Sequence, residues 1–435
     1  MRYIPDSCED EILKEINFTK EKLFSDIPED LRSDLDLWDE KSEMEVKREL
    51  KNILDKNRVI LNFLGAGVYN HYIPSAVKEI VRRSEFYSCY TPYQPEVSQG
   101  MLQALFEYQS LMAELLDMDV VNSSMYDWAT SLAEAALMCY RVKKKPKFII
   151  SKNIHPERRE VLKTYTEGIL EIVEMEYNEK GIDLEDLKKN IDNSCGVYIE
   201  NPTFLGYFEQ NLEEIGEIVH KNDALLVAGV DPISLGIIKP PGEYADIAIG
   251  ESVGYPVSFG GPLLGIFGVR NDMSLIRKMP GRLIGVTEDL EGNSGFVMTL
   301  QTREQHIRRE KATSNICSNE ALCAVASAVY LSFLGKKGLK ELAELCMKNS
   351  NYTMKRINEI KGFKAPLFNS PHFKEFTVYH KNIREIDRKL LKKDIQGGVV
   401  LERIGFDLKD TALYCVTEVH SKEDINRLIS ILEVI

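Results

Sequence analysis

One short segment is rich in groups that bind ligands and move protons. Tyr90–Gln99 reads Tyr-Thr-Pro-Tyr-Gln-Pro-Glu-Val-Ser-Gln, with two phenols, two amides, two hydroxyls and one carboxylate. Its prolines, Pro92 and Pro95, restrict the backbone. Rigid loops with converging polar side chains are typical of binding sites. We therefore expect this loop to form part of a site.

A second polar segment, Gln301–Lys311, holds six charged residues and one histidine within eleven positions. It can supply Arg303 and His306 to a site. It can equally be a solvated helix face on which Glu and Arg pair at helical spacing, each pair adding a few tenths of a kcal/mol. Charge alone favours the solvated face.

Asp231 ends the apolar run Leu225–Val230 and precedes a proline. In a doubly wound sheet, ligands bind at the carboxyl ends of the strands. In enzymes that use pyridoxal phosphate, an aspartate there pairs with the pyridinium nitrogen. A loop-capping aspartate looks the same in sequence, so spacing leaves both readings open.

The lysine that such an enzyme needs for its Schiff base is missing where we expect it. No lysine occurs between Lys239 and Lys278, although the next strand and its loop fall in that interval. Gly65-Ala-Gly67 resembles the start of a dinucleotide fingerprint, but Asn70 stands where the third glycine belongs. We interpret it as a tight turn.

The elements that must position these residues alternate between strand and helix. Apolar runs at 147–151, 170–175, 195–200, 224–230, 246–249 and 263–269 predict strands, and helical periodicity separates most of them. This alternation predicts an α/β fold with a mostly parallel sheet covered by helices. We expect a helical N-terminal arm over 1–58 that packs on something larger, a large domain over 59–360 and a small α+β domain over 361–435.

Composition excludes several classes of protein. The chain has 435 residues and a net charge of −13, which argues against nucleic acid as a partner. Its uncharged stretches are broken by Gly, Pro, Asn and His, so we expect no membrane span. The N-terminus has no apolar signal segment, and the eight cysteines show no ligand spacing. We expect a cytoplasmic protein without a metal site.

Several motifs together resemble the glycine dehydrogenase (decarboxylating) family, the P-protein of the glycine cleavage system. The match is best with the first (alpha) subunit of the two-chain form, from Arg2 to at least Gly335. The motifs are Phe63-Leu-Gly-Ala-Gly67, Ser84-Glu-Phe-Tyr87, Tyr90–Gly100, Lys239-Pro-Pro-Gly-Glu243, Ser258-Phe-Gly-Gly-Pro262, Met279-Pro-Gly-Arg282 and the ungapped run Gln301–Cys317. One departure is Trp128, where relatives usually have a small residue.

The resemblance implies a fold like that of pyridoxal-phosphate-dependent transferases of fold type I. It also implies an α2β2 complex in which the second (beta) subunit carries the Schiff-base lysine and holds the cofactor covalently. Glycine then loses CO2, and its aminomethyl group passes to the lipoyl arm of the H-protein, a co-substrate. No nicotinamide is expected on this chain.

By the same resemblance, the Tyr90–Gln99 loop completes the partner's active site. We expect Tyr93 and Glu96 to be catalytic, and Tyr90, Gln94, His71 and Arg303 to bind substrate or cofactor. Asp231 is then a relic of a cofactor site.

Two alternatives stay open. One is a purely structural subunit that stabilises the lysine-bearing chain. The other is an independent enzyme that holds pyridoxal phosphate without a covalent bond or through Lys239.

Overall fold

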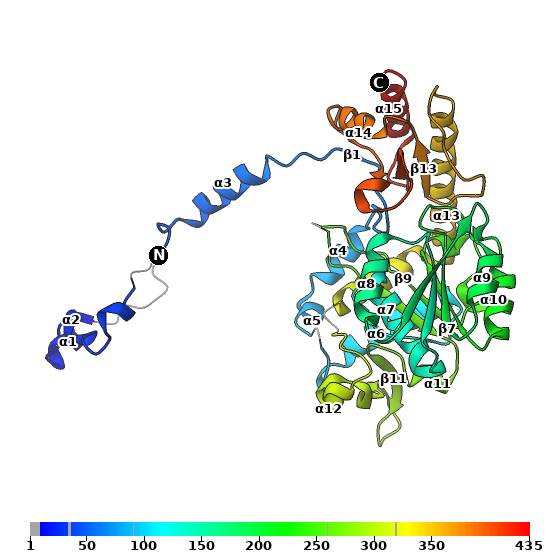
Figure 1. Cartoon of the computed structure of the whole chain (residues 1–435). Coiled ribbons are helices and arrows are strands. Elements are labelled where there is room, and N and C mark those ends of the chain that lie inside the picture. Colours follow the sequence, from blue (N-terminus) through cyan, green and yellow to red (C-terminus); the bar gives the residue numbers. More distant parts are fainter. Residues whose placement is uncertain (1–8, 34–35, 90, 259, 318–319) are drawn as a thin grey trace. The chain divides into compact units, whose positions relative to one another are not determined.

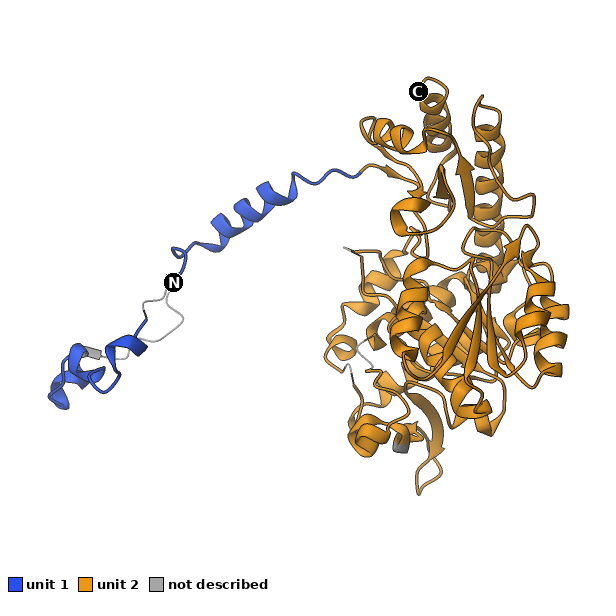
Figure 2. Ribbon diagram, viewed as in Figure 1, with its two compact units in different colours: residues 1–59 blue, residues 60–435 orange. Residues whose placement is uncertain are grey.

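The computed structural model describes residues 9–33, 36–89, 91–258, 260–317 and 320–435. The chain divides into two compact units, residues 1–59 and 60–435 (Figure 2). The expected limits at residues 58 and 360 stay a prediction. The elements of the first unit are α1 (Glu9–Glu15), α2 (Lys20–Leu23), η1 (Glu29–Leu31) and α3 (Glu43–Leu54).

In the first unit, α3 begins with a capping box. The Ser42 hydroxyl accepts the Glu45 amide at 3.3 Å, and the Ser42 amide donates to the Glu45 carboxylate at 2.8 Å. No described side chain of this unit belongs to a buried hydrophobic core. The arm is therefore helical, as its periodicity predicts, but its described side chains form no hydrophobic core that would stabilise it.

A seven-stranded sheet forms the centre of the second unit (Figure 1). Its strands pair in parallel except one, which is antiparallel to both of its neighbours. The inner strands β7 and β8 are buried along their whole length because helices cover both faces. In spatial order the strands are β2 (Val120–Val121), the antiparallel β10 (Gly265–Val269), β9 (Ile247–Glu251), β8 (Leu225–Val230), β7 (Ser194–Asn201), β3 (Lys147–Ser151) and β4 (Glu171–Met175).

Helices form a layer on each face of this sheet, around two separate hydrophobic cores. One layer contains α7 (Trp128–Lys143), α8 (Pro156–Thr166) and α11 (Met273–Ile276). The other contains α4 (Ser75–Val81), α6 (Gln99–Leu116), α9 (Leu184–Asn190), α10 (Leu212–Lys221) and the start of α13 (Ala321–Asn358). The predicted mostly parallel α/β sheet is confirmed.

A small lobe follows α13 and has its own core. Its antiparallel sheet orders the strands β13-β16-β15, and the short β1 pairs in parallel with β14. The run Ser421-Lys-Glu-Asp424 predicts a capping box, and this is confirmed: the Asp424 amide donates to the Ser421 hydroxyl at 3.1 Å, and the Ser421 amide donates to the Asp424 carboxylate at 3.0 Å. The elements are β13 (Glu375–Tyr379), α14 (Ile383–Leu391), β14 (Ile395–Gln396), β15 (Val399–Val400), η7 (Leu401–Ile404), β16 (Thr411–Cys415), α15 (Lys422–Leu432) and β1 (Leu61–Asn62).

The long helix α13 joins the large and small lobes. Two glycines in this stretch, Gly335 and Gly338, predict an interruption of the helix, but only Gly335 leaves helical geometry, at φ 59° and ψ −178°. In the described chain, α13 alone is long and apolar enough to cross a membrane. Half of its most apolar stretch is buried in the protein, which is typical of a core helix.

A β-hairpin and the turns after it complete the second unit. The Gln99 side chain accepts from the Phe296 amide at 2.8 Å and donates to its carbonyl at 2.9 Å, which ties the start of α6 to the hairpin. This places the described part of the predicted loop, residues 91–99, beside the segment 301–317. We call residues 91–99 the Tyr93 loop. The elements are α5 (Ser84–Tyr87), η2 (Pro95–Val97), β5 (Tyr177–Asn178), β6 (Gly181–Ile182), η3 (Ser234–Gly236), η4 (Pro241–Glu243), β11 (Leu283–Glu288), β12 (Ser294–Thr299), η5 (Gln301–Arg303), α12 (Gln305–Arg308) and η6 (Arg309–Lys311).

Candidate functional site

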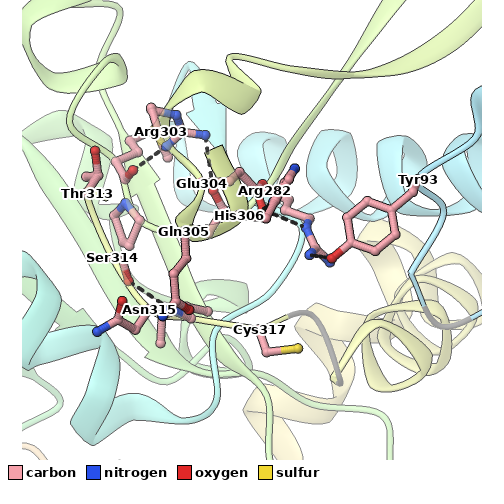
Figure 3. A pocket seen from close by; sticks show the side chains of 14 residues that line it. Tyr93, Arg282, Arg303, Glu304, Gln305, His306, Thr313, Ser314, Asn315 and Cys317 are labelled. Carbon is pink, nitrogen blue, oxygen red and sulfur yellow. Dashed lines mark hydrogen bonds and ion pairs between the residues drawn. The ribbon is translucent and has the colours of Figure 1, made fainter. Parts of the chain in front are cut away.

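The Tyr93 loop forms one wall of a pocket of about 160 Å³. Figure 3 shows Tyr93 and Arg282 meeting on one side of it, with Thr313, Ser314 and Asn315 on the other. We call it the Tyr93 pocket; its lining is Tyr93, Met279, Pro280, Gly281, Arg282, Arg303, Glu304, Gln305, His306, Thr313, Ser314, Asn315, Ile316 and Cys317. The structure thus brings together two segments that the sequence singled out.

Arg282 fixes the Tyr93 phenol within this pocket. Its Nη2 donates to the Tyr93 hydroxyl at 2.9 Å, and its Nε pairs with Glu304 at 3.3 Å. The Arg282 side chain is 7% exposed, whereas Tyr93 is 53% exposed. The His306 ring meets the Tyr93 ring edge-on at 5.7 Å. A buried guanidinium therefore holds an exposed phenol in one orientation.

Arg303 is occupied mainly with the backbone of the pocket. Its Nε donates to the Leu300 carbonyl at 3.2 Å and its Nη2 to the Gly281 carbonyl at 3.1 Å. A third bond reaches the Met279 carbonyl. Burial lowers the pKa of this guanidinium. Arg303 thus ties two turns together, and two of its five donors have no partner among the described residues.

The other predicted residues of the loop lie at its surface. Glu96, within η2, and Gln94, before it, are both exposed. In the described part of the chain, neither side chain has a hydrogen bond to another residue. Tyr90, the remaining predicted residue, lies outside the described residues. Glu96 and Gln94 can therefore turn toward a partner at no cost in lost contacts.

His71 lies in a different place, the cleft between the large and small lobes. Its Nδ1 is 2.7 Å from the Glu418 carboxylate, and its Nε2 is 3.1 Å from Lys374 Nζ. Burial and the nearby Lys374 lower the pKa of His71. Burial opposes ionisation of Glu418, but hydrogen bonds from His71 and the Tyr72 amide outweigh it and hold that pKa at about 2. The pair is a neutral imidazole that donates to a carboxylate.

Asp231 is also in this cleft, at the carboxyl end of β8, where the topology predicted a ligand-binding residue. Its carboxylate pairs with Lys374 Nζ at 2.5 Å. Both side chains are almost fully buried, at 6% and 2% exposed. Lys374 comes from the small lobe, just before β13. The ammonium also lies 3.4 Å from the centre of the Tyr69 ring. Asp231 is thus already neutralised from within the chain.

The Gly65-Ala-Gly67 turn binds a carboxylate of the protein itself. The Ala66 amide donates to Glu375 at 2.6 Å, and the Tyr69 hydroxyl donates to it at 2.8 Å. A Cβ at Gly65 would lie 2.4 Å from the same carboxylate, so only glycine fits. Burial raises the pKa of Glu375 to about 7 despite these bonds. The interpretation of this segment as a tight turn, not a nucleotide loop, agrees with this geometry.

The start of α7 closes the opposite end of the cleft. Helix N-termini bind phosphates through free amides, but here the Thr130 amide donates to Asp127 at 2.7 Å and the Trp128 amide to Glu251 at 3.0 Å. The Trp128 ring lies under the Arg158 guanidinium at 3.5 Å. Arg158 in turn pairs with Glu200 at 2.8 Å.

These residues do not fit pyridoxal phosphate. The cofactor needs a flat space for its ring, free amides for its phosphate and an unpaired aspartate for its nitrogen. Trp128 fills the cleft, carboxylates cap α7, and Lys374 occupies Asp231. The two pockets left here measure about 10 and 30 Å³, room for one or two waters. The chain's own cleft is therefore filled by side chains.

Sequence reasoning singled out Trp128 but missed Lys374 and Glu375, which also fill the cleft. Lys374 and Glu375 begin an apolar strand, and two adjacent charges at a strand entry were the available indication. Arg282 closes a motif that was noted without a role. The ligand atoms of His71, Cys346 and Glu418 lie within 4.8 Å of one another, but the first and third are hydrogen-bonded to each other. The expectation of a protein without a metal site stays a prediction.

Comparison with known proteins gives a consistent result over the whole chain. The family model "Glycine cleavage system P-protein" matches residues 1–432. A protein of Pyrococcus horikoshii named "Probable glycine dehydrogenase (decarboxylating) subunit 1" is 53% identical over 99% of this chain and 98% of its own. One of Thermococcus kodakarensis with the same name is 52% identical, covering 99% and 97%.

Solved structures agree with this result. A crystal structure of glycine decarboxylase (P-protein) in inhibitor-bound form superposes with a TM-score of 0.86, at 37% identity and full coverage of both chains. A cysteine desulfurase from Thermococcus onnurineus, at 16% identity, a TM-score of 0.60 and coverage of 92% and 99%, shares the fold alone. The fold is that of pyridoxal-phosphate-dependent enzymes of fold type I, as expected. The chain belongs to the glycine cleavage system P-protein family.

Proposed function

We propose that this chain is the first subunit of a two-chain glycine decarboxylase and completes the active site of the second subunit. Relatives named subunit 1 that match over their full length support a second subunit. The observation that carries the proposal is the contrast between a filled cleft and an exposed Tyr93 loop. A chain whose own cleft has no room for the cofactor but that presents ordered polar groups at its surface is suited to serve a site on another chain.

In the proposed reaction, glycine loses CO2 and its aminomethyl group passes to the oxidised lipoyl arm of the H-protein, whose disulfide takes the electrons. Pyridoxal phosphate, held covalently by a lysine of the second subunit, supplies the electron sink. Fold neighbours of this type support the cofactor. We further propose an α2β2 assembly in the cytoplasm.

Within that assembly, Tyr93 and Glu96 act on the substrate side of the shared site. Arg282 orients the Tyr93 phenol, which can still accept or donate one hydrogen bond. Glu96 is exposed beside it and can orient the glycine amine or carry a proton. Gln94 is exposed in the same loop, and Tyr90, which lies outside the described residues, stays a proposed ligand of substrate or cofactor. The remaining donors of Arg303 suit a carboxylate at the pocket wall.

His71 has a structural role away from the Tyr93 pocket. Its two ring nitrogens are both engaged inside the cleft, so we assign it to holding the lobes and not to contact with glycine. We also propose the domain limits 1–58, 59–360 and 361–435. The separate core of the small lobe supports a distinct C-terminal domain, and Phe63, Met354 and Ile357 also belong to that core. The N-terminal arm, whose described side chains form no buried core, is assigned to packing on the partner subunit.

The second candidate is a purely structural subunit. It is favoured by one observation: the Tyr93 hydroxyl already has a protein partner in Arg282. Under this reading the Tyr93 pocket only braces the loop, and glycine never touches this chain.

One experiment separates the two functions. Glu96→Gln, reconstituted with the second subunit, is assayed for glycine decarboxylation with the H-protein. Loss of a positioned proton-transfer group lowers rates by about 10²–10⁴-fold, so we expect kcat to fall at least about 100-fold. The control is Glu217→Gln on α10, another exposed glutamate. Normal turnover by the Glu96 variant in an intact complex would establish the structural role.

A further inference from the structure

The carboxyl end of β8 is where an open α/β sheet offers its ligand site, and in this chain a lysine from the other lobe fills it. Asp231 follows β8 and Lys374 precedes β13, so their 2.5 Å contact joins the large lobe to the small one. The lysine side chain is 2% exposed. Burying such a pair is costly unless every remaining donor and acceptor is also satisfied.

The surrounding groups meet that condition. The second oxygen of Asp231 accepts the Ile233 amide at 3.0 Å. Lys374 Nζ also donates to His71 Nε2 at 3.1 Å, and His71 Nδ1 donates to Glu418 at 2.7 Å. The other carboxylate oxygen of Glu418 accepts the Tyr72 amide at 2.7 Å. We call Asp231, Lys374, His71 and Glu418 the interlobe relay.

The charges facing the relay are unfavourable for an anionic ligand. The cleft around the relay contains two cations, Lys374 and Arg158. Four carboxyl groups lie in the same cleft, those of Asp231, Glu418, Glu200 and Glu375. Glu251 adds a fifth at the start of α7. A phosphate that entered would meet carboxylates where free amides would be needed to hold it.

Lys374 is also on the wrong side of the cleft to anchor a cofactor. An aldehyde that forms an imine with lysine lies across the pyridine ring from the nitrogen that an aspartate binds. Lys374 contacts the aspartate itself, and its nitrogen is engaged as a donor to Asp231 and His71. Lys374 Nζ therefore lies where the pyridine nitrogen of a cofactor would contact Asp231, and not where a lysine would anchor the cofactor.

We propose that Lys374 replaces the cofactor in this chain: its ammonium neutralises Asp231, and the interlobe relay fixes the small lobe on the large one. The inference rests on the proposed function only in leaving pyridoxal phosphate to the second subunit. It assigns the filled cleft a structural purpose, which is to hold the small lobe on the large one.

The test measures the thermal unfolding midpoint of the full chain alone. Lys374→Met leaves Asp231 buried and unpaired, so we expect the midpoint to fall by roughly 3–5 °C. Adding Asp231→Leu removes the stranded charge and should recover most of that loss. Lys188→Met, which breaks the exposed 3.0 Å pair with Glu185, is the control and should change the midpoint by no more than about 1 °C.

A second readout needs no variant. The chain alone is incubated with pyridoxal phosphate, reduced with borohydride and mapped by peptide. We expect no stoichiometric label on Lys374. A stoichiometric pyridoxyl group there, or a Lys374→Met midpoint no lower than that of the Lys188 control, would overturn the inference. Neither readout depends on glycine turnover, so failure here is distinguishable from failure of the proposed function.

Discussion

Two clusters in this molecule are built from the same three kinds of side chain and differ in access to solvent. In the cleft, Arg158 lies over the Trp128 ring at 3.5 Å and pairs with Glu200 at 2.8 Å. In the Tyr93 pocket, Arg282 lies 5.0 Å from the Tyr93 ring centre and pairs with Glu304 at 3.3 Å.

The difference lies in the aromatic partner. Trp128 is 4% exposed and donates its indole N–H to Tyr198 inside the protein, whereas Tyr93 is 53% exposed. The buried cluster in the cleft thus stabilises the fold, and we call it the closed cluster. The solvent-accessible cluster of the Tyr93 pocket presents a hydroxyl at the surface, and we call it the open cluster. Residue types alone do not separate these two roles, but burial does.

The largest expected effect comes from removing the Trp128 ring from the closed cluster. Trp128→Ala removes a buried ring that packs on Arg158, and large-to-small core changes of this kind cost about 3–5 kcal/mol. We expect the free energy of unfolding of the isolated chain to fall by that amount in urea titration. The matched control is Trp38→Ala, in the first unit. Equal stability of the two variants would mean that the cleft is not close-packed around Trp128.

A substitution in the open cluster should change the activity of the complex and not the stability of the chain. Tyr93→Phe removes only the hydroxyl that Arg282 holds, so kcat of the reconstituted complex should fall about 10- to 100-fold, or about 1.4–2.7 kcal/mol. The unfolding midpoint of the chain should stay within about 1 °C. Tyr379→Phe, in the small lobe, serves as the control. A stable Tyr93→Phe variant with full activity would remove the phenol from the mechanism.

The carboxyl groups of the cleft predict a pH dependence. Because burial raises the pKa of Glu375 to about 7, the folded chain holds its proton more tightly than the unfolded chain. This stabilisation is present below the unfolded pKa and is lost as pH rises toward 7. Glu375→Gln keeps a hydrogen-bonding oxygen but cannot ionise. Its stability relative to the original chain should rise by about 2–3 kcal/mol between pH 4.5 and 8, as measured by urea titration at each pH. A constant difference would contradict the raised pKa.

The smallest expected effect concerns the edge of the open cluster. His306→Leu removes an edge-on ring contact with Tyr93 that is worth about 0.5–1.5 kcal/mol. We expect a loss of activity of only a few-fold, measured at saturating glycine. A loss as large as that of Tyr93→Phe would instead make His306 a direct participant.

Much of the fold followed from sequence because its strands are rich in apolar residues and its helices periodic. Helical periodicity predicts helices over 184–190 and 212–221, and α9 and α10 have these bounds. The capping residues at Ser421 also sufficed to place a helix start. These features are local, so neighbouring residues carry the information.

The site was less accessible because its contacts join distant segments. The Tyr93 loop and the segment 301–317 could each be recognised as polar, but their meeting through Arg282 depends on Gln99 and the hairpin. The cleft is a stronger case. Asp231 and Lys374 are far apart in sequence, and no spacing rule connects the end of a large-lobe strand with the start of a small-lobe one.

The central claim is that the Tyr93 pocket faces a cofactor held by the second subunit. It is tested most directly by placing a photocrosslinking phenylalanine analogue at position 93 in the reconstituted complex, reducing the complex with borohydride and mapping the crosslinked peptides. The account predicts crosslinks from position 93 to the second subunit close to its pyridoxyl-lysine peptide, and none from the same analogue at position 379. A pyridoxyl group on this chain, or crosslinks from position 93 confined to it, would contradict the account.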